Sequence, residues 1–128
     1  MSRRWNRRVS PAFVVAFVIV ASACGGGGGG GVTKTAVNGK IDVNASDPYN
    51  FDVKTIKATP GPLTITLHEK GGQEHTFTMS DPKIDLKVTS SHPEATGTVT
   101  LQAGRTYKFR CAYDGHAAAG MVGEIVVG

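Results

Sequence analysis

Hydrophobic and polar residues alternate along most of the chain after residue 33. In residues 62–69, which read PLTITLHE, the apolar side chains of Leu63, Ile65 and Leu67 fall on one face. Successive side chains of a β-strand point to opposite sides, so this pattern predicts strands with one buried and one solvated face. The 3.6-residue period of an amphipathic helix does not occur in this part of the sequence.

Further strands are expected from the same alternation, with turn-forming residues between them. Their expected positions are residues 33–43 (around an Asn-Gly turn), 51–58, 74–79, 84–88, 97–102, 105–111 and 123–128. Seven or eight short strands at this spacing predict an all-β protein folded as a β-sandwich.

The first 23 residues differ from this pattern and have the features of a secretory signal peptide. Four arginines precede an apolar run at residues 12–23, which ends in small residues as a cleavage site should. A membrane-spanning helix needs about 20 apolar residues, which is more than this run provides. We therefore expect residues 1–23 to be removed; an uncleaved membrane anchor is the alternative.

Cys24 follows the apolar run, and the sequence Ala-Ser-Ala-Cys resembles the lipobox of bacterial lipoproteins, in which the cysteine is lipidated. The first residue of that motif is more often Leu, whereas position 21 of this chain is Ala. Seven consecutive glycines follow at residues 25–31, and such a run behaves as a flexible tether. We expect a lipidated Cys24 and linker at residues 24–33, then one domain at residues 34–128. The protein is expected to be exported and lipid-anchored on the extracytoplasmic side of the cell membrane, by the Sec or the twin-arginine route.

The mature protein is expected to be nearly neutral, although the whole chain has a formal net charge of +4. Four of the 14 Lys and Arg lie in residues 1–23, which leaves 10 basic against 10 acidic residues in residues 24–128. Affinity for nucleic acid rests on many cations that neutralise phosphates. A nucleic-acid partner is therefore not expected.

The chain has two cysteines, and lipidation of Cys24 leaves Cys111 unpaired. An unpaired cysteine in an exported protein requires either burial or a metal. Cys111 opens the segment CAYDGHAAAGM, in which four residues separate it from His116 and four more separate His116 from Met121. An Asp-Gly turn and Gly120 allow this segment to fold back, so that a thiol, an imidazole and a thioether can meet at one point.

A fourth ligand is expected from a histidine elsewhere in the chain. His75 shares a strand face with Phe77 and Met79, which predicts that it points into one end of the sandwich. His68 lies on the polar face of its strand, and His92 precedes a proline in a polar loop. Both are expected at the surface, so we choose His75.

Together, these residues supply two imidazoles, one thiolate and one thioether. This donor set describes a type 1 (blue) copper centre, with two His and one Cys in a plane and a weak axial Met. Structural zinc sites favour Cys and His and have little use for Met. One copper ion is therefore the expected cofactor, and its expected ligands are His75, Cys111, His116 and Met121. A buried cysteine and a core methionine without any metal are the alternative.

The segments that hold these residues resemble the cupredoxins, in particular the small plastocyanin- and azurin-like electron carriers. YKFRCAYDGHAAAGMVGEIVV, at residues 107–127, is similar to their copper-binding C-terminal segment, and GGQEHTFTM, at residues 71–79, to the strand that bears the first histidine. The resemblance covers roughly residues 47–128. It implies a Greek-key β-sandwich with copper near one end, and electron transfer as the function.

Two positions depart from the family pattern. Asp114 stands where the family often has proline before the glycine of the ligand loop, and Thr76 stands where asparagine commonly follows the first histidine. The hydrogen bond by which that asparagine steadies the loop then has to come from the Thr76 hydroxyl or the backbone. Both changes bear on the reduction potential rather than on ligation.

The leading hypothesis is a membrane-tethered, monomeric electron carrier that exchanges electrons with redox protein partners and is not an enzyme. Copper delivery or homeostasis is the alternative, although the chain lacks the Met- and His-rich surface sites that exchange favours. An enzyme with Cys111 as nucleophile and His116 or His75 as base explains neither Met121 nor the loop. A structural module without metal is the remaining possibility.

Overall fold

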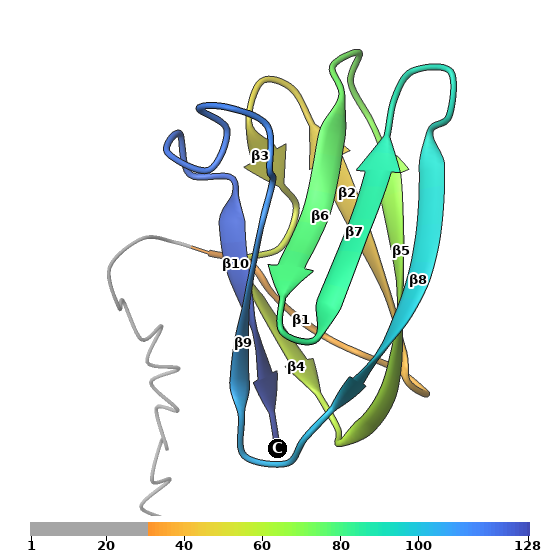
Figure 1. Cartoon of the computed structure of the whole chain (residues 1–128), viewed down its shortest axis with the longest axis vertical. Coiled ribbons are helices and arrows are strands. Elements are labelled where there is room, and N and C mark those ends of the chain that lie inside the picture. Colours follow the sequence, from red (N-terminus) through yellow and green to blue (C-terminus); the bar gives the residue numbers. More distant parts are fainter. Residues whose placement is uncertain (1–30) are drawn as a thin grey trace, which may run out of the picture.

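The computed structural model describes residues 31–128, and the regular structure in this part of the chain is entirely β (Figure 1). Since residues 31–128 contain no helix, none there is long and apolar enough to cross a membrane. The expected signal peptide, Cys24 and all but the last of the seven glycines lie outside the described residues. The strands are β1 (Thr33–Thr35), β2 (Lys40–Ser46), β3 (Asn50–Phe51), β4 (Thr55–Ala58), β5 (Gly61–Glu69), β6 (His75–Ser80), β7 (Lys83–Val88), β8 (Glu94–Leu101), β9 (Thr106–Arg110) and β10 (Val122–Val127).

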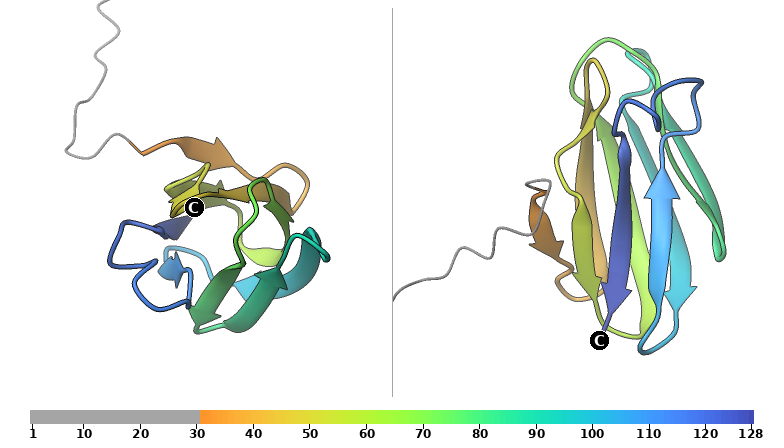
Figure 2. Two further views of the ribbon diagram at one scale, coloured as in Figure 1. Left: turned by 90° about the horizontal axis from the view of Figure 1, so that it is seen from above. Right: turned by 90° about the vertical axis from the view of Figure 1, so that its left-hand side faces the viewer.

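These strands form two sheets that pack face to face as a sandwich (Figure 2). One sheet has six strands in the order β1-β4-β10-β9-β6-β7, and the other has four in the order β3-β2-β5-β8. The chain crosses between the sheets from β1 to β2, β3 to β4, β4 to β5, β5 to β6, β7 to β8 and β8 to β9. The predicted all-β sandwich is confirmed.

The predicted number of strands, seven or eight, is wrong, because the described residues contain ten. The two shortest strands account for the difference. β1 pairs with β4 over three residues, and β3 pairs with β2 over two. Two of the expected stretches each cover two strands, because residues 33–43 include β1 and most of β2, and residues 51–58 include the end of β3 and all of β4. The alternation does not show where one short strand ends and the next begins.

The core lies between the sheets and has an aromatic centre. The rings of Phe77 and Phe109 stack with centroids 4.4 Å apart, and Phe51 meets both from the other sheet. Phe77 follows His75 by two residues, and Phe109 precedes Cys111 by two, so each pair falls on the same face of its strand. This packing therefore fixes the backbone positions from which two of the predicted ligands project.

One end of the sandwich collects the connections that carry the predicted ligands. β9 and β10 are antiparallel neighbours, and residues 111–121 connect them. β6 begins at His75 next to this connection and pairs with β9 through Thr78 and Arg110. The β2–β3 and β5–β6 loops lie at the same end (Figure 1).

Candidate metal centre

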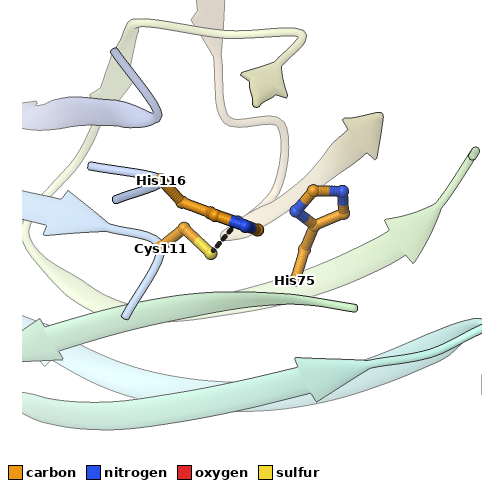
Figure 3. A group of neighbouring side chains, drawn as sticks. All are labelled: His75, Cys111 and His116. Carbon is orange, nitrogen blue, oxygen red and sulfur yellow. Dashed lines mark hydrogen bonds between the residues drawn. The ribbon is translucent and has the colours of Figure 1, made fainter. Parts of the chain in front are cut away.

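Three of the four predicted ligands place donor atoms together at this end of the sandwich. One ring nitrogen each of His75 and His116 and the sulfur of Cys111 all lie within 4.8 Å of one another. His75 and Cys111 are fully buried, and His116 is partly exposed. Figure 3 shows the sulfur beside the His116 ring, with the His75 ring facing both.

The backbone of residues 111–121 closes into a compact loop that also holds Met121. The Cys111 N–H donates to the Met121 carbonyl at 3.0 Å, and the Met121 N–H donates to the His116 carbonyl at 3.0 Å. Gly115 and Gly120 have φ of 80° and 105°, a region that residues with a Cβ rarely adopt. The predicted turn at Asp114-Gly115 therefore forms, and Met121, which is fully buried, comes to the same end as the other three predicted ligands.

The sulfur of Cys111 receives contacts from two neighbouring segments. It lies 3.4 Å from Nδ1 of His116 and accepts the Thr76 backbone N–H, also at 3.4 Å. The Thr76 hydroxyl lies 3.9 Å from the sulfur and accepts the Ala112 N–H at 2.7 Å. Thr76 thus ties the start of the ligand loop to β6 through both its backbone and its hydroxyl, the two sources expected in place of asparagine.

The two ring nitrogens of His75 have different surroundings. Nδ1 is buried and has no hydrogen-bond partner, whereas Nε2 lies 3.3 Å from Asp47 Oδ1. Buried polar atoms almost always have a partner, so an unpartnered ring nitrogen next to a thiol and a second imidazole fits a metal ligand. Soft sulfur and imidazole nitrogen are the donors that copper prefers, and the residues present therefore fit a copper ion.

The other two histidines lie away from this centre. His68 contacts Asp42 through Nε2 at 2.9 Å and Glu94 through Nδ1 at 3.4 Å, on the outer face of the four-stranded sheet. His92 is exposed in the β7–β8 connection and bonds to Ser91. Both lie outside the sandwich interior, as expected.

Two carboxylates lie beside His75, and neither was predicted from the sequence to be part of the site. Asp47 accepts the Gly72 N–H at 2.8 Å and the Gln73 N–H at 3.1 Å. The bond from Gly72 is the main cause that lowers the pKa of Asp47; partial burial opposes it, and the contact with His75 adds to it. Glu69 is buried, and its Oε2 has no hydrogen-bond partner. A sequence signal existed only for Glu69, which continues the inward face of β5 after Leu67.

Two tyrosines flank the partly exposed His116. The ring centroid of Tyr49 lies 4.7 Å from that of His116, and the ring centroid of Tyr113 lies 5.6 Å from it. The Tyr113 hydroxyl donates to Glu74, and this bond is the main cause that lowers the pKa of Glu74. Next to the rings, the loop exposes Ala118, Ala119 and Gly120. The surface around His116 thus contains two aromatic rings and small loop residues, and the Glu74–Lys87 ion pair lies beside Tyr113.

A sandwich of this topology with a cysteine and two histidines at one end defines the class of small cupredoxins. Residues 37–128 match the family model that describes copper binding proteins of the plastocyanin/azurin family. The chain belongs to this family, and copper is its cofactor. No curated protein sequence matches the chain significantly.

Solved structures with the same fold come from several organisms. The metal-binding domain of the Cu(I)-exporting P-type ATPase CopA of Streptococcus pneumoniae aligns with a TM-score of 0.62 and 20% identity, over 78% of this chain and 99% of that one. Reduced auracyanin from Roseiflexus castenholzii aligns with a TM-score of 0.54 and 18% identity, over 73% and 99%. Oxidised plastocyanin from Dryopteris crassirhizoma gives 0.54 and 18%, over 69% and 100%. At these identities the likeness concerns the fold, and ligation by the four named residues stays a prediction.

Proposed function

We propose that the protein is an electron carrier with a single type 1 copper centre. The observation that carries the proposal is the gathering of the Cys111 sulfur and one nitrogen each of His75 and His116 within 4.8 Å, at a largely buried site. Auracyanin and plastocyanin, two structural neighbours, were solved in a reduced and an oxidised form respectively. A role in redox cycling is consistent with the grouped donor atoms of this chain and with the two redox forms of its structural neighbours.

The chain's part in electron transfer is to hold the donors in one arrangement. When copper is bound, it supplies one-electron chemistry by alternating between Cu(II) and Cu(I). Cys111 and Met121 are joined by a backbone hydrogen bond, and Cys111 is tied to β6 by Thr76. His75 stands on a strand whose next inward residue, Phe77, packs in the aromatic core. Donors fixed in this way move little when the electron arrives or leaves, which lowers the barrier to transfer.

His116 is the proposed point at which the electron enters and leaves. Its side chain is the exposed member of the three-donor cluster, and the surrounding surface is formed by Tyr49, Tyr113 and the alanines of the loop. A monomeric carrier of this kind meets its donor and acceptor proteins through small, transient interfaces below about 1,200 Å².

Export and membrane tethering through Cys24 form a second part of the proposal. The support is the lipobox-like sequence before Cys24 and the run of glycines after it, which is long enough to separate a small domain from a membrane surface. Cys24→Ala tests the tether by fractionation of cells that express the full chain. The variant is expected in the soluble fraction or as unprocessed precursor, with copper binding by the domain unchanged.

Copper delivery is the second candidate function, and one observation favours it. The structural neighbour with the TM-score of 0.62 is the metal-binding domain of a Cu(I)-exporting ATPase. Delivery requires ready release of the ion, whereas His75 and Cys111 of this chain are fully buried. Burial of two donors therefore favours the carrier.

A visible spectrum after addition of Cu(II) distinguishes the two functions. A carrier gives an intense blue band from charge transfer between the thiolate and Cu(II), which bleaches with a reductant and returns with an oxidant through many cycles. A colourless complex supports delivery instead. So does a complex that gives up its copper to a Cu(I) chelator once the copper is reduced.

A further inference from the structure

Two carboxylates face the ring nitrogen of His75 that points away from the cysteine. His75 Nε2 lies 3.3 Å from Asp47 Oδ1 and 3.9 Å from Glu69 Oε2. One donor atom of each of the three residues lies within 4.8 Å of the others. The ring of His75 therefore separates a sulfur-and-imidazole side from a carboxylate side.

Glu69 is placed here by the register of β5. It is the last residue of the strand and follows the inward-facing Leu67 by two positions, so its side chain enters the sandwich and is only 2% exposed. Oε1 accepts the Gly71 N–H, but Oε2 has no hydrogen-bond partner. Burial of an unpartnered carboxylate oxygen costs free energy, so its persistence next to a predicted ligand indicates a role at the site.

Asp47 is held by a loop that is shaped around its carboxylate. The N–H groups of Gly72 and Gln73 bind its two oxygens. A Cβ on Gly71 would lie 2.4 Å from Asp47 Cγ, which is too close for any side chain at residue 71 without a shift. Two backbone donors and a required glycine thus fix the Asp47 oxygen that faces Nε2.

We propose that Asp47 and Glu69 are positioning residues of the copper site that act through His75. Asp47 accepts the Nε2–H and so selects the tautomer whose Nδ1 lone pair faces Cys111 and His116. The carboxyl groups beside Nε2 make the ring a stronger donor, which stabilises the more highly charged Cu(II) relative to Cu(I). The reduction potential is consequently lower than the four ligands alone would set. This proposal rests on the proposed copper ligation by His75.

A divalent cation bound between Asp47, Glu69 and His75 Nε2 is the rival use of the same groups. That use requires the opposite tautomer, in which Nε2 is deprotonated and Nδ1 carries the proton. A protonated Nδ1 would need an acceptor, and Nδ1 is buried without any partner in the protein. The geometry therefore favours the positioning role.

The test compares isosteric variants that remove charge but keep shape. Asp47→Asn, Glu69→Gln and the double variant are loaded with copper in the full chain, and their reduction potentials are measured. Asp42→Asn is the matched control, since Asp42 lies 2.9 Å from His68 Nε2 in a comparable pair on the outer face. The double variant is expected to bind Cu(II) at least about tenfold more weakly relative to Cu(I) than the wild type does. For one electron, this change raises the reduction potential by about 59 mV.

A second readout separates tuning from a merely structural role. The coupling of the remote His75 nitrogen in pulsed electron paramagnetic resonance is expected to change in Asp47→Asn and to stay unchanged in Asp42→Asn. Asp47 is partly exposed, so this variant keeps the test available even where Glu69→Gln reduces folding.

Two results would overturn the proposal. One is blue double-variant protein whose potential matches that of the Asp42→Asn control. The other is a wild-type potential that rises on addition of Zn(II) while the double variant does not respond, because this result assigns the carboxylates to a cation. A wild-type chain without the blue band contradicts the proposed function itself, and is thereby distinguished from failure of this inference.

Discussion

Two histidines of residues 31–128 each face two carboxylates, and only one of them lies in the candidate metal centre. His75 and His68 stand on consecutive strands, β6 and β5. His68 uses both ring nitrogens, one on Asp42 at 2.9 Å and one on Glu94 at 3.4 Å. His75 turns only Nε2 to its carboxylates and leaves Nδ1 buried without a partner.

The difference shows that a carboxylate neighbour alone does not identify a functional histidine. The His68 side chain is 23% exposed, and water screens its contacts with the two carboxylates, so they contribute at most about 1 kcal/mol each. The His75 side chain is fully buried. Its unpartnered nitrogen faces a sulfur, and an unsatisfied buried group of that kind costs about 1–3 kcal/mol unless a metal completes it. The unpartnered Nδ1 therefore distinguishes His75, in the candidate metal centre, from His68.

The largest expected effect comes from removal of the sulfur while both histidines stay in place. Cys111→Ser exchanges a soft donor for a hydroxyl of nearly the same size, so the blue band is expected to vanish completely. The apo domain is expected to keep its fold, with a change of about 1 kcal/mol in the free energy of unfolding. Visible absorption and urea denaturation measure the two quantities. A blue Cys111→Ser protein contradicts the whole assignment.

Removal of each histidine in turn tests the comparison directly. Changes to residues that only orient a ligand weaken metal binding by about 10- to 100-fold, so loss of a ligand in His75→Ala is expected to exceed that range. His68→Ala is expected to bind Cu(II) as the wild type does. Competition with a chelator of known affinity measures both. Equal losses in the two variants would mean that the free nitrogen of His75 has no special role.

A smaller effect is expected from the sulfur of Met121. Met121→Leu keeps both histidines and the cysteine, so copper is expected to stay bound. Met121 is predicted to be a weak axial donor, and loss of such a donor favours the less charged Cu(I). The reduction potential is therefore expected to rise by roughly 59 mV or more, a tenfold change in the relative affinities. Met121→Gln, with an oxygen donor, is expected to lower it. Complete loss of copper from Met121→Leu would show that the residue is not an axial ligand.

The parts of the site that were predictable are those set by local spacing. The intervals between Cys111, His116 and Met121 are visible in the sequence, because a short loop between adjacent strands brings its two ends together. His75 was found from its phase with Phe77, since the alternation of a strand decides which side chains enter the sandwich. The sandwich itself followed from the same alternation.

The parts that were missed depend on contacts between distant segments. Asp47 lies in a stretch that the sequence marks only as a turn, and nothing local indicates that the Gly72 and Gln73 N–H groups will bind it. Glu69 carried a signal, because a charged residue in phase with Leu67 must either break the strand or enter the interior. Strands β1 and β3 were too short to be told apart from the neighbouring strands within the expected stretches 33–43 and 51–58.

The smallest expected effect concerns the surface beside His116, in contrast to the outer face that bears His68. Ala118 is exposed on the ligand loop, next to the partly exposed His116. Residues 24–128 carry 10 basic and 10 acidic side chains, so a partner is not drawn in by a strong field, and docking is expected to rest on apolar contact. Ala118→Lys is therefore expected to leave the blue colour and the reduction potential unchanged. It is expected to slow electron transfer to the physiological partner severalfold, and added salt is expected to alter the wild-type rate only weakly.

Thr100→Lys is the matched control, because it adds the same charge to an exposed position of β8 in the other sheet. Stopped-flow kinetics with each variant measure the rates. If Ala118→Lys transfers electrons at the wild-type rate, or if Thr100→Lys is slowed equally, the electron leaves by a face other than the one around His116.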